Sequence, residues 1–525
     1  MMTYKLVLKI FIGLVALALL YLGITKIVIE PLIGRKLQSA LNEGNKDFIV
    51  EIGKTRISIF RSELELENIT ISSKTEQQGI PELKGEIESI KIEGINLTKA
   101  IFKKDFEIKE ITVFNSTIKG QISFNKKEKR AKVSPFNVRI DSLFLDKTNL
   151  DIKDALTAQV YSVKDGVLKV FDIKVEKLDT LSLGIIKQID FNIQEFITVS
   201  SDSMYTKAAI GINYSANSST LVIDSISVHP NYPDYEFTNR HKFATDRFEA
   251  GFNHVTAHNF SPDDYFKSTN LISSYIEIGK MNMNVFRDKR KPFRHVNKPA
   301  FQDMIYNYHG AINIDSIGLI NGDITYTEHD EKANEAGHIS LNEINAKIYN
   351  ITNDTIYKTE SAFLKLTAEA LLMGKGKLNF MLKGRIFDHQ NTFSVNGKLA
   401  GMEISELNPM LEKNAFVFVT SGKIDAMNFS FTANNTKASG KMTFLYHGLE
   451  VAIKNKRTDD TTAIKERFLS IIANKKLMNS NPVPGDGVRV GIIDYERDPE
   501  KFLINYSFKS VLTGIKSSLV KDPKK

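Results

Sequence analysis

The sequence predicts a mostly β protein with an N-terminal transmembrane helix. A long curled antiparallel sheet follows, folded into a taco-like groove, and a few short helices interrupt its strands. An apolar run near the N-terminus is long enough to cross a bilayer. From Val50 onward, apolar and polar residues alternate with a period of two, as in half-buried strands. Over roughly 450 residues, strands of ordinary length would number more than about 20, whereas a twisted open sheet rarely exceeds about ten strands without curling or splitting. Such a sheet must curl, close or stack, and of these we expect it to curl.

The first element, residues 1–30, is predicted to be the membrane anchor. The core Ile10 to Ile24 is uninterrupted, and a short polar step separates it from Ile27, Val28 and Ile29. The anchor residues are Ile10, Phe11, Leu14, Leu17, Leu20, Leu22 and Ile24. The alternative is a cleaved signal peptide, but the small-residue triplet Ala16-Leu17-Ala18 lies inside the run rather than after it. We therefore interpret the run as an uncleaved, single-pass anchor.

The charges that flank the anchor do not orient it. Lys5, Lys9 and the α-amino group on one side are balanced by Lys26, Arg35 and Lys36 on the other. Long C-terminal domains are translocated largely regardless of such charges. We therefore expect the body of the protein to lie outside the cytoplasm.

Composition narrows the classes of function. The net charge of +8 arises from 70 basic and 62 acidic residues, and the excess is spread along the chain, so nucleic acid is not an expected partner. An anionic membrane surface is compatible with that charge. The chain has no cysteine, which excludes disulfides, thiolate metal sites and thiol catalysis.

Residues 31–44 are predicted to form a stalk helix that begins near Pro31, and residues 45–457 an extended β-rich body. The alternation places one apolar face along the sheet. It is either filled by side chains or left open for a ligand. The residues selected as candidates for a lipid-binding groove are the following apolar members of the first strands: Ile57, Ile59, Leu64, Leu66, Ile69, Ile71, Ile90, Ile92 and Ile108.

A looser recurrence, in which I-x-I pairs are separated by two residues, runs through the body. Examples are Ile87, Ile90, Ile92, Ile95 and Leu97, and later Ile312, Ile314, Ile317 and Leu319. The two-residue gaps predict bulges or turns that switch the inward face. No strict repeat length emerges, so a solenoid of fixed period is not expected.

Few helices interrupt the strands. Ser261-Pro262-Asp263-Asp264 combines an N-cap, a proline at the first helical position and acidic residues in the first turn, which predicts a short helix to about Asn270. Ser405 is expected to start another. Residues 458–525 are predicted to form a C-terminal helix and a closing strand or helix segment, in which Phe508, Val511, Leu512, Ile515 and Leu519 share a stripe that docks on a partner or on the body.

No catalytic motif with supporting context is present, so we do not expect an enzyme, a metal site or a cofactor. His254 and His258 have the i, i+4 spacing of a helical zinc pair, but the intervening residues lack the glutamate of H-E-x-x-H and favour a strand. Gly374-Lys-Gly-Lys377 resembles part of a phosphate loop, yet alternating residues follow it and predict a hairpin turn.

An N-terminal anchor, a Pro-Leu stalk and I-x-I-x-x-I strands over hundreds of residues resemble the AsmA-like family of the bacterial envelope, which is related to TamB and to bridge-like lipid-transfer proteins. Similar blocks stand at Val285 to Arg290, Ile324 to Glu328, Ser421 to Tyr446 and Tyr506 to Lys516. The resemblance implies an inner-membrane anchor, a periplasmic body and a groove that carries phospholipid acyl chains towards the outer membrane.

The expected function is therefore that of a membrane-anchored periplasmic protein that shields phospholipid acyl chains in an apolar β-groove and contributes to outer-membrane lipid homeostasis or assembly. The alternative is an anchored envelope scaffold with an ordinary packed β core, whose partners are envelope proteins. Expected partners are accordingly the membrane, phospholipid and envelope proteins.

Overall fold

The computed structural model describes residues 15, 21–43, 48–58, 60–74, 82–95, 105–122, 137–175, 188–355, 363–454 and 476–520. It confirms the mostly β prediction, with 19 strands and a few short helices in this part of the chain. The chain divides into two compact units, unit 1 (Met1–Asn217) and unit 2 (Ser218–Lys525).

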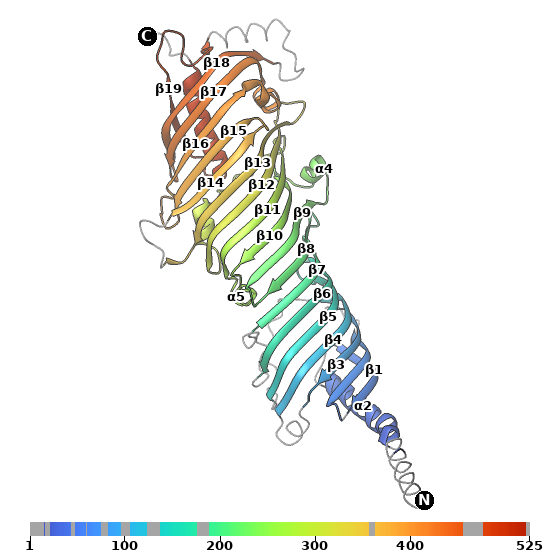
Figure 1. The fold of residues 1–525 in the computed structure, drawn as a ribbon. Coiled ribbons are helices and arrows are strands. Elements are labelled where there is room, and N and C mark those ends of the chain that lie inside the picture. Colours follow the sequence, from blue (N-terminus) through green and yellow to red (C-terminus); the bar gives the residue numbers. More distant parts are fainter. Residues whose placement is uncertain are drawn as a thin grey trace, which may run out of the picture. The chain divides into compact units, whose positions relative to one another are not determined.

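The described part of unit 1 starts with helical turns and continues as strands (Figure 1). Its helical elements are η1 (Thr25–Ile29) and α2 (Glu30–Glu43). Its strands are β1 (Phe48–Ser58), β2 (Glu63–Ser73), β3 (Leu83–Glu93), β4 (Asp105–Ile122), β5 (Asn137–Asp154), β6 (Val160–Val175), β7 (Gln188–Val199) and β8 (Tyr205–Ser215). Successive strands pair with each other, antiparallel throughout except for the parallel pair β4 and β5.

Unit 2 repeats this arrangement with more strands. They are β9 (Thr220–Pro230), β10 (Arg247–His258), β11 (Leu271–Asp288), β12 (Ile312–His329), β13 (Gly337–Thr352), β14 (Phe363–Leu372), β15 (Gly376–Arg385), β16 (Phe393–Glu403), β17 (Val417–Ala433), β18 (Lys437–Ile453) and β19 (Val490–Glu496). Here β11 and β12 form the parallel pair, and the other registers are antiparallel.

Short helices connect or follow these strands. They are α4 (Asp234–Asn239), α5 (Pro262–Ser268), α6 (Phe301–Tyr306), η4 (Ile404–Leu407), α7 (Asn408–Met410), η5 (Leu411–Ala415) and α9 (Leu503–Leu519). The predicted helix after Ser261 is confirmed as α5, with Ser261 Oγ accepting from the Asp264 N–H at 3.3 Å. The hairpin turn at Gly374 is confirmed between β14 and β15, and His254 and His258 lie in β10, a strand as predicted.

Residues with a left-handed backbone explain the two-residue gaps in the I-x-I recurrence. In β2, Asn68 has φ 54°, and Gly53 stands opposite it between the pairs Lys54–Glu67 and Ile52–Ile69, so no residue is inserted and the register is unchanged. Leu66 and Ile69 are both buried although they are three residues apart, because the strand turns at Asn68. The apolar face therefore continues past this position without the bulge and the change of face that we expected. Asn115 in β4 and Lys147 in β5 have the same backbone conformation at corresponding places.

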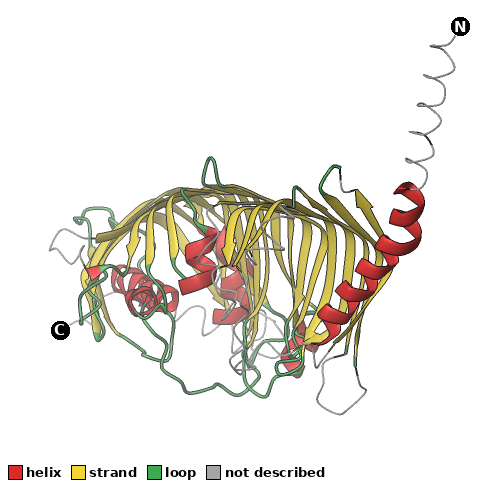
Figure 2. Cartoon of the chain, turned by 90° about the horizontal axis from the view of Figure 1, so that it is seen from below, coloured by secondary structure: helices red, strands yellow, loops and turns green. Residues whose placement is uncertain are grey.

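The core of unit 2 lies between one face of its strands and the helices packed on that face. Fully buried members include Val395, Met442 and Ile493. Helix α9 packs against β18 and β19 through a stripe of mostly small residues at four-residue spacing, namely Tyr506, Ser510, Gly514 and Ser518. The C-terminal helix in Figure 2 accordingly lies close against the strands. Val511, Ile515 and Leu519 pack on the same core, whereas Phe508 is half exposed.

One structural expectation changes. The predicted curled sheet is wrong, because within each unit the strands form a sheet that is not strongly curled (Figure 1). Helices cover the apolar face in unit 2, so burying that face requires no curling. No helix among the described residues is long and apolar enough to cross a membrane. Of the predicted anchor residues, Leu22 and Ile24 lie in a helix with about half of each side chain exposed, and the other five lie outside the described residues.

Candidate functional site

Unit 1 carries rows of apolar side chains that cross its strands at right angles. Directly paired residues share a face, so the register defines each row. The first row contains Ile57, Leu64, Ile92, Ile111, Leu143 and Val170. The second contains Leu66, Ile90, Val113, Leu145, Leu168 and Phe191. We call the surface made by these two rows the apolar face.

The candidate groove residues fall largely on this face. Five of them, Ile57, Leu64, Ile92, Leu66 and Ile90, belong to its two rows. Ile69 and Ile71 stand in the neighbouring rows, opposite Ile52 and Val50. Ile108 pairs with Ile140, beyond the ends of β2 and β3. Ile59 lies outside the described residues.

The apolar face is only partly covered. Leu66 and Val170 are buried, and the other members of the two rows are half-buried. Helix α2 packs on β1 at one end of the face, where a Cβ on Gly34 would lie 2.5 Å from Thr55 Oγ1. No described helix makes more than marginal contact with β3 to β7. The apolar surface of these strands therefore faces no packed layer from the described part of the chain.

Helix α2 also satisfies the backbone of β1 at the sheet edge. The N–H of Val50 donates to Asn42 Oδ1 at 2.8 Å, and Asn42 Nδ2 donates to the Val50 carbonyl at 2.8 Å. Glu30 Oε1 accepts from the N–H of Ile57 at 3.1 Å. These side chains occupy groups that would otherwise be free to pair with another strand. The stalk is thus fixed to the sheet at the end of the apolar face.

The opposite face of unit 1 is charged. Arg56 Nη1 lies 2.9 Å from Glu67 Oε1 and 3.6 Å from Glu65 Oε2. Lys91 Nζ lies 2.8 Å from Glu93 Oε1, and this pairing raises the pKa of Lys91. Since these residues alternate with Leu64, Leu66, Ile90 and Ile92, the two faces of the same strands have opposite chemical character.

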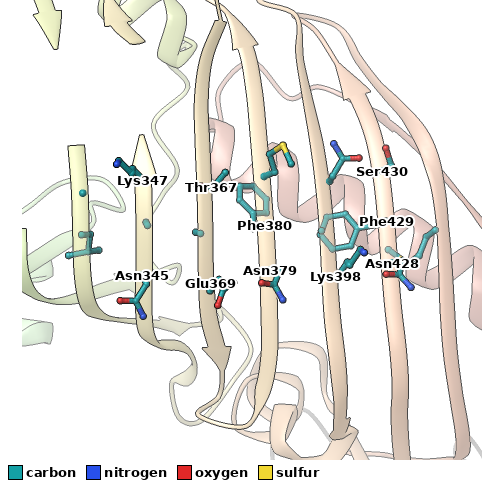
Figure 3. A pocket seen from close by; sticks show the side chains of 18 of the residues that line it. Asn345, Lys347, Thr367, Glu369, Asn379, Phe380, Lys398, Asn428, Phe429 and Ser430 are labelled. Carbon is teal, nitrogen blue, oxygen red and sulfur yellow. The ribbon is translucent and has the colours of Figure 1, made fainter. Parts of the chain in front are cut away.

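In unit 2 the corresponding apolar face is a packed core, and its exposed face carries a hollow of about 800 Å³. The hollow crosses the strands between two ladders of side chains, and we call it the polar groove (Figure 3). One ladder is Lys347, Thr367, Met381, Asn396, Ser430 and Lys441. The other is Asn345, Glu369, Asn379, Lys398, Asn428 and Thr443.

The floor of the polar groove is the backbone of the row between the ladders. This row includes Ala346, Phe380, Gly397, Phe429 and Met442. Phe429 and Met442 are buried in the core, so the side chains of this row point away from the groove. The ring of Phe429 lies over Gly397, where no Cβ would fit. The sequence interpretation missed this groove, because a polar face of a strand is ordinarily just solvated.

A cluster of charges lies where the parallel strands β11 and β12 end. Arg287 Nη1 donates to Asp246 Oδ1 at 3.1 Å. Glu328, which pairs with Arg287 in the strand register, accepts from Lys289 Nζ at 2.6 Å and from Tyr326 Oη at 2.6 Å. Each of these two carboxylates therefore has a cationic partner, an arrangement that ties the ends of the strands to the following loop.

Burial and hydrogen bonds have opposite effects on the carboxylate pKa values in this cluster. Burial raises the pKa of Asp246 in spite of Arg287. Burial also acts to raise the pKa of Glu328, but the hydrogen bonds from Lys289 and Tyr326 outweigh it, so that the pKa is lowered. The pKa of Asp288 is lowered by the side-chain hydrogen bonds from Arg290, at 2.9 and 2.8 Å.

Comparison with known proteins adds no functional assignment. No protein-family model matches the sequence, and no curated protein shows a significant match. The two candidate binding surfaces are the apolar face of unit 1 and the polar groove of unit 2.

Proposed function

We propose that the protein binds phospholipid acyl chains on the apolar face of unit 1 and carries them at the bacterial envelope, from a membrane to which its N-terminus is anchored. The observation that carries this proposal is the pair of continuous apolar rows, which cross β2 to β6 and are uncovered by described helices. The resemblance to the AsmA-like family points to the same ligand.

The physical basis is non-specific burial. Each buried CH₂ group contributes about 0.8 kcal/mol, so a continuous apolar strip holds an acyl chain without a dedicated polar contact. The rows pass the parallel pair β4 and β5 without interruption, because Ile111 faces Leu143 and Val113 faces Leu145. A chain lying along a row would thus meet isoleucine, leucine and valine side chains on every strand that it crosses.

The position of α2 supports this proposal. The helix follows the predicted anchor directly, and its side chains are hydrogen-bonded to β1. It would set the start of the apolar face close to the bilayer that holds the anchor, where a lipid would enter. The charged opposite face would remain in water.

Site-specific photo-crosslinking tests the proposal. A photoreactive residue at Ile90 or Ile92, on the apolar face, should capture phospholipid from cells. The matched control is the same residue at Lys91, which lies between them in β3 and points to the charged face. Lipid mass spectrometry of the protein purified in mild detergent gives the stoichiometry. Equal lipid capture at Ile90 and Lys91, or no co-purified phospholipid, would refute the proposal.

The second candidate is an anchored scaffold for envelope proteins, and the packed core of unit 2 favours it for that part of the chain. A scaffold would be crosslinked to protein from its exposed face, for example from Lys91 or Glu93, and would yield no lipid from Ile90. The same set of crosslinking positions therefore separates the two functions.

A further inference from the structure

The exposed face of unit 2 concentrates positive charge around the polar groove. Six exposed cationic side chains project from β13, β14, β15, β16 and β18, and none forms an ion pair within 4.0 Å in the described part of the chain. They are Lys347, Lys365, Lys383, Arg385, Lys398 and Lys441. Two acidic residues share this face: Glu369 lies 3.6 Å from Lys377, and Glu277 of β11 stands in the same cross-strand row as Lys347. The surface therefore has an excess of unpaired positive charge.

Two of these cations oppose each other across neighbouring strands. Lys365 in β14 pairs directly with Lys383 in β15, and Arg385 stands two residues farther on the same face. Like charges in directly opposite positions destabilise a sheet. Lys383 Nζ lies 3.9 Å from the centre of the Phe363 ring, and Arg385 Cζ lies 5.5 Å from it. The Phe363 ring offsets only part of the repulsion between Lys365 and Lys383, whereas a bound anion would neutralise it.

The groove beside these cations suits an extended chain. It crosses β11 to β18, and eight strands about 4.8 Å apart give a length of roughly 34 Å. Asparagine side chains recur along it, at Asn345, Asn379, Asn396 and Asn428. Each side-chain amide offers hydrogen-bond donors and an acceptor. It therefore suits a ligand with hydroxyl groups, which also donate and accept, better than a ligand that carries charged acceptors alone.

We propose that this face binds an anionic polysaccharide, which lies across the strands in the polar groove. The asparagine ladder contacts its hydroxyl groups, and the carboxylate or phosphate groups of the polymer reach Lys365, Lys383 and Arg385. The binding site is separate from the apolar face, so it does not depend on the proposed lipid function.

Single-stranded nucleic acid has the same charge but fits the face less well. Bases stack on free aromatic rings, and the rings near the groove are covered by the protein's own cations. Lys347 Nζ lies 5.6 Å from the Tyr275 ring centre and 5.2 Å from that of Tyr349. Phe363 is covered in the same way by Lys383.

Binding measurements on the full chain in detergent test this proposal. The probes are polygalacturonate as the anionic polysaccharide, dextran as a neutral one, oligothymidylate, and vesicles that contain phosphatidylglycerol. The variant K365Q/K383Q removes the opposed pair. The control K207Q/K332Q removes the same charge from exposed positions outside the groove. The variant N396A/N428A removes two groove amides and leaves the charge unchanged.

We expect polygalacturonate to bind and dextran to bind much more weakly. K365Q/K383Q should lower polygalacturonate affinity by about tenfold or more, and K207Q/K332Q by less than about twofold. N396A/N428A should weaken the binding of polygalacturonate but not the binding of oligothymidylate. Equal losses in the two lysine double variants would overturn the proposal. Tighter binding of oligothymidylate or of vesicles, with the same dependence on Lys365 and Lys383, would overturn it in favour of nucleic acid or membrane.

Discussion

The backbone N–H of Ile492, on the outer edge of β19, donates a hydrogen bond to Ser517 Oγ of α9 at 3.1 Å. Two residues on, the N–H of Asp494 donates to Thr513 Oγ1 at 3.2 Å. Helix α9 thus does for β19 what α2 does for β1 through Asn42. In both cases side chains of a helix satisfy strand groups that would otherwise recruit another strand.

We predict that S517A/T513A destabilises the protein and promotes self-association. The two edge N–H groups lose their partners; because both hydrogen bonds are exposed and water can replace them, the expected loss of unfolding free energy is about 0.5–1.5 kcal/mol for each. Denaturant unfolding measures the loss, and analytical ultracentrifugation measures association. S507A, on the same helix, serves as the control and should change neither. If S517A/T513A remained monomeric and as stable as the wild type, edge protection would not be the role of these hydroxyls.

At the other edge, Asn42 both accepts from and donates to Val50. Asn42 Nδ2 also donates to the Gln38 carbonyl at 2.8 Å. We predict a graded effect in which N42A loses all three side-chain hydrogen bonds, whereas N42D keeps an acceptor for the Val50 N–H and loses the two bonds that Nδ2 donates. Hydrogen exchange of the Val50 amide reports the change, since that N–H keeps its acceptor in N42D. Protection of the amide should fall strongly in N42A and slightly in N42D. Identical exchange in the two variants would contradict this arrangement.

Part of this architecture was predictable from sequence. The alternation of apolar and polar residues identified the strands, and the capping residues around Ser261 identified α5. Both signals lie within a few neighbouring residues of the chain. The role of the two-residue gaps was not predictable: the left-handed backbone at Asn68 allows Leu66 and Ile69 both to be buried, and Gly53 stands opposite Asn68 in the neighbouring strand. The polar groove was equally hidden. Lys365 and Lys383 are 18 positions apart, and only the register makes them neighbours.

The parallel pairs were also unpredictable, because nothing local distinguishes β4 or β11 from an antiparallel strand. The direction of a strand follows from where its connection leads. For α9, the predicted stripe does pack on the body through Val511, Ile515 and Leu519. The sequence did not reveal the close approach through Ser510, Gly514 and Ser518, because small residues do not stand out in an apolar pattern.

The close packing of α9 makes a prediction about Gly491. A Cβ at this residue would meet Ser518 Oγ and the carbonyl oxygen of Gly514. We expect G491A to cost about 1–3 kcal/mol of unfolding free energy, as overpacking does. The control is G251A, another strand glycine, whose Cβ would have no neighbour within 4 Å. Thermal or denaturant unfolding should show G251A close to the wild type; similar losses in both variants would mean that α9 packs less tightly than described.

Acidification should weaken the loop after β11. The hydrogen bonds from Arg290 lower the folded-state pKa of Asp288 below its ordinary value of about 4. The pair therefore stabilises the fold above pH about 4, and the contribution is lost as the pH falls through the lower, folded-state pKa. D288N should cost about 1–2 kcal/mol at neutral pH and flatten the loss of stability below pH about 4. D224N, at an exposed strand position, should leave the pH profile unchanged. A D288N profile parallel to the wild type would exclude Asp288 as a source of the acid sensitivity.

The contrast between the two units gives a final prediction. Leu145 is half-buried on the apolar face of unit 1, whereas Val395 has 0% of its surface exposed in the core of unit 2. V395Q buries an amide without partners and should cost about 3 kcal/mol or more, enough to reduce soluble yield. L145Q should cost about 1 kcal/mol or less, yet lower the phospholipid that co-purifies, because it interrupts the row between Val113 and Leu168. Unfolding curves and lipid mass spectrometry of the two variants separate these effects. If L145Q proved as destabilising as V395Q, the apolar face would be filled by the chain itself and would not be available to a lipid.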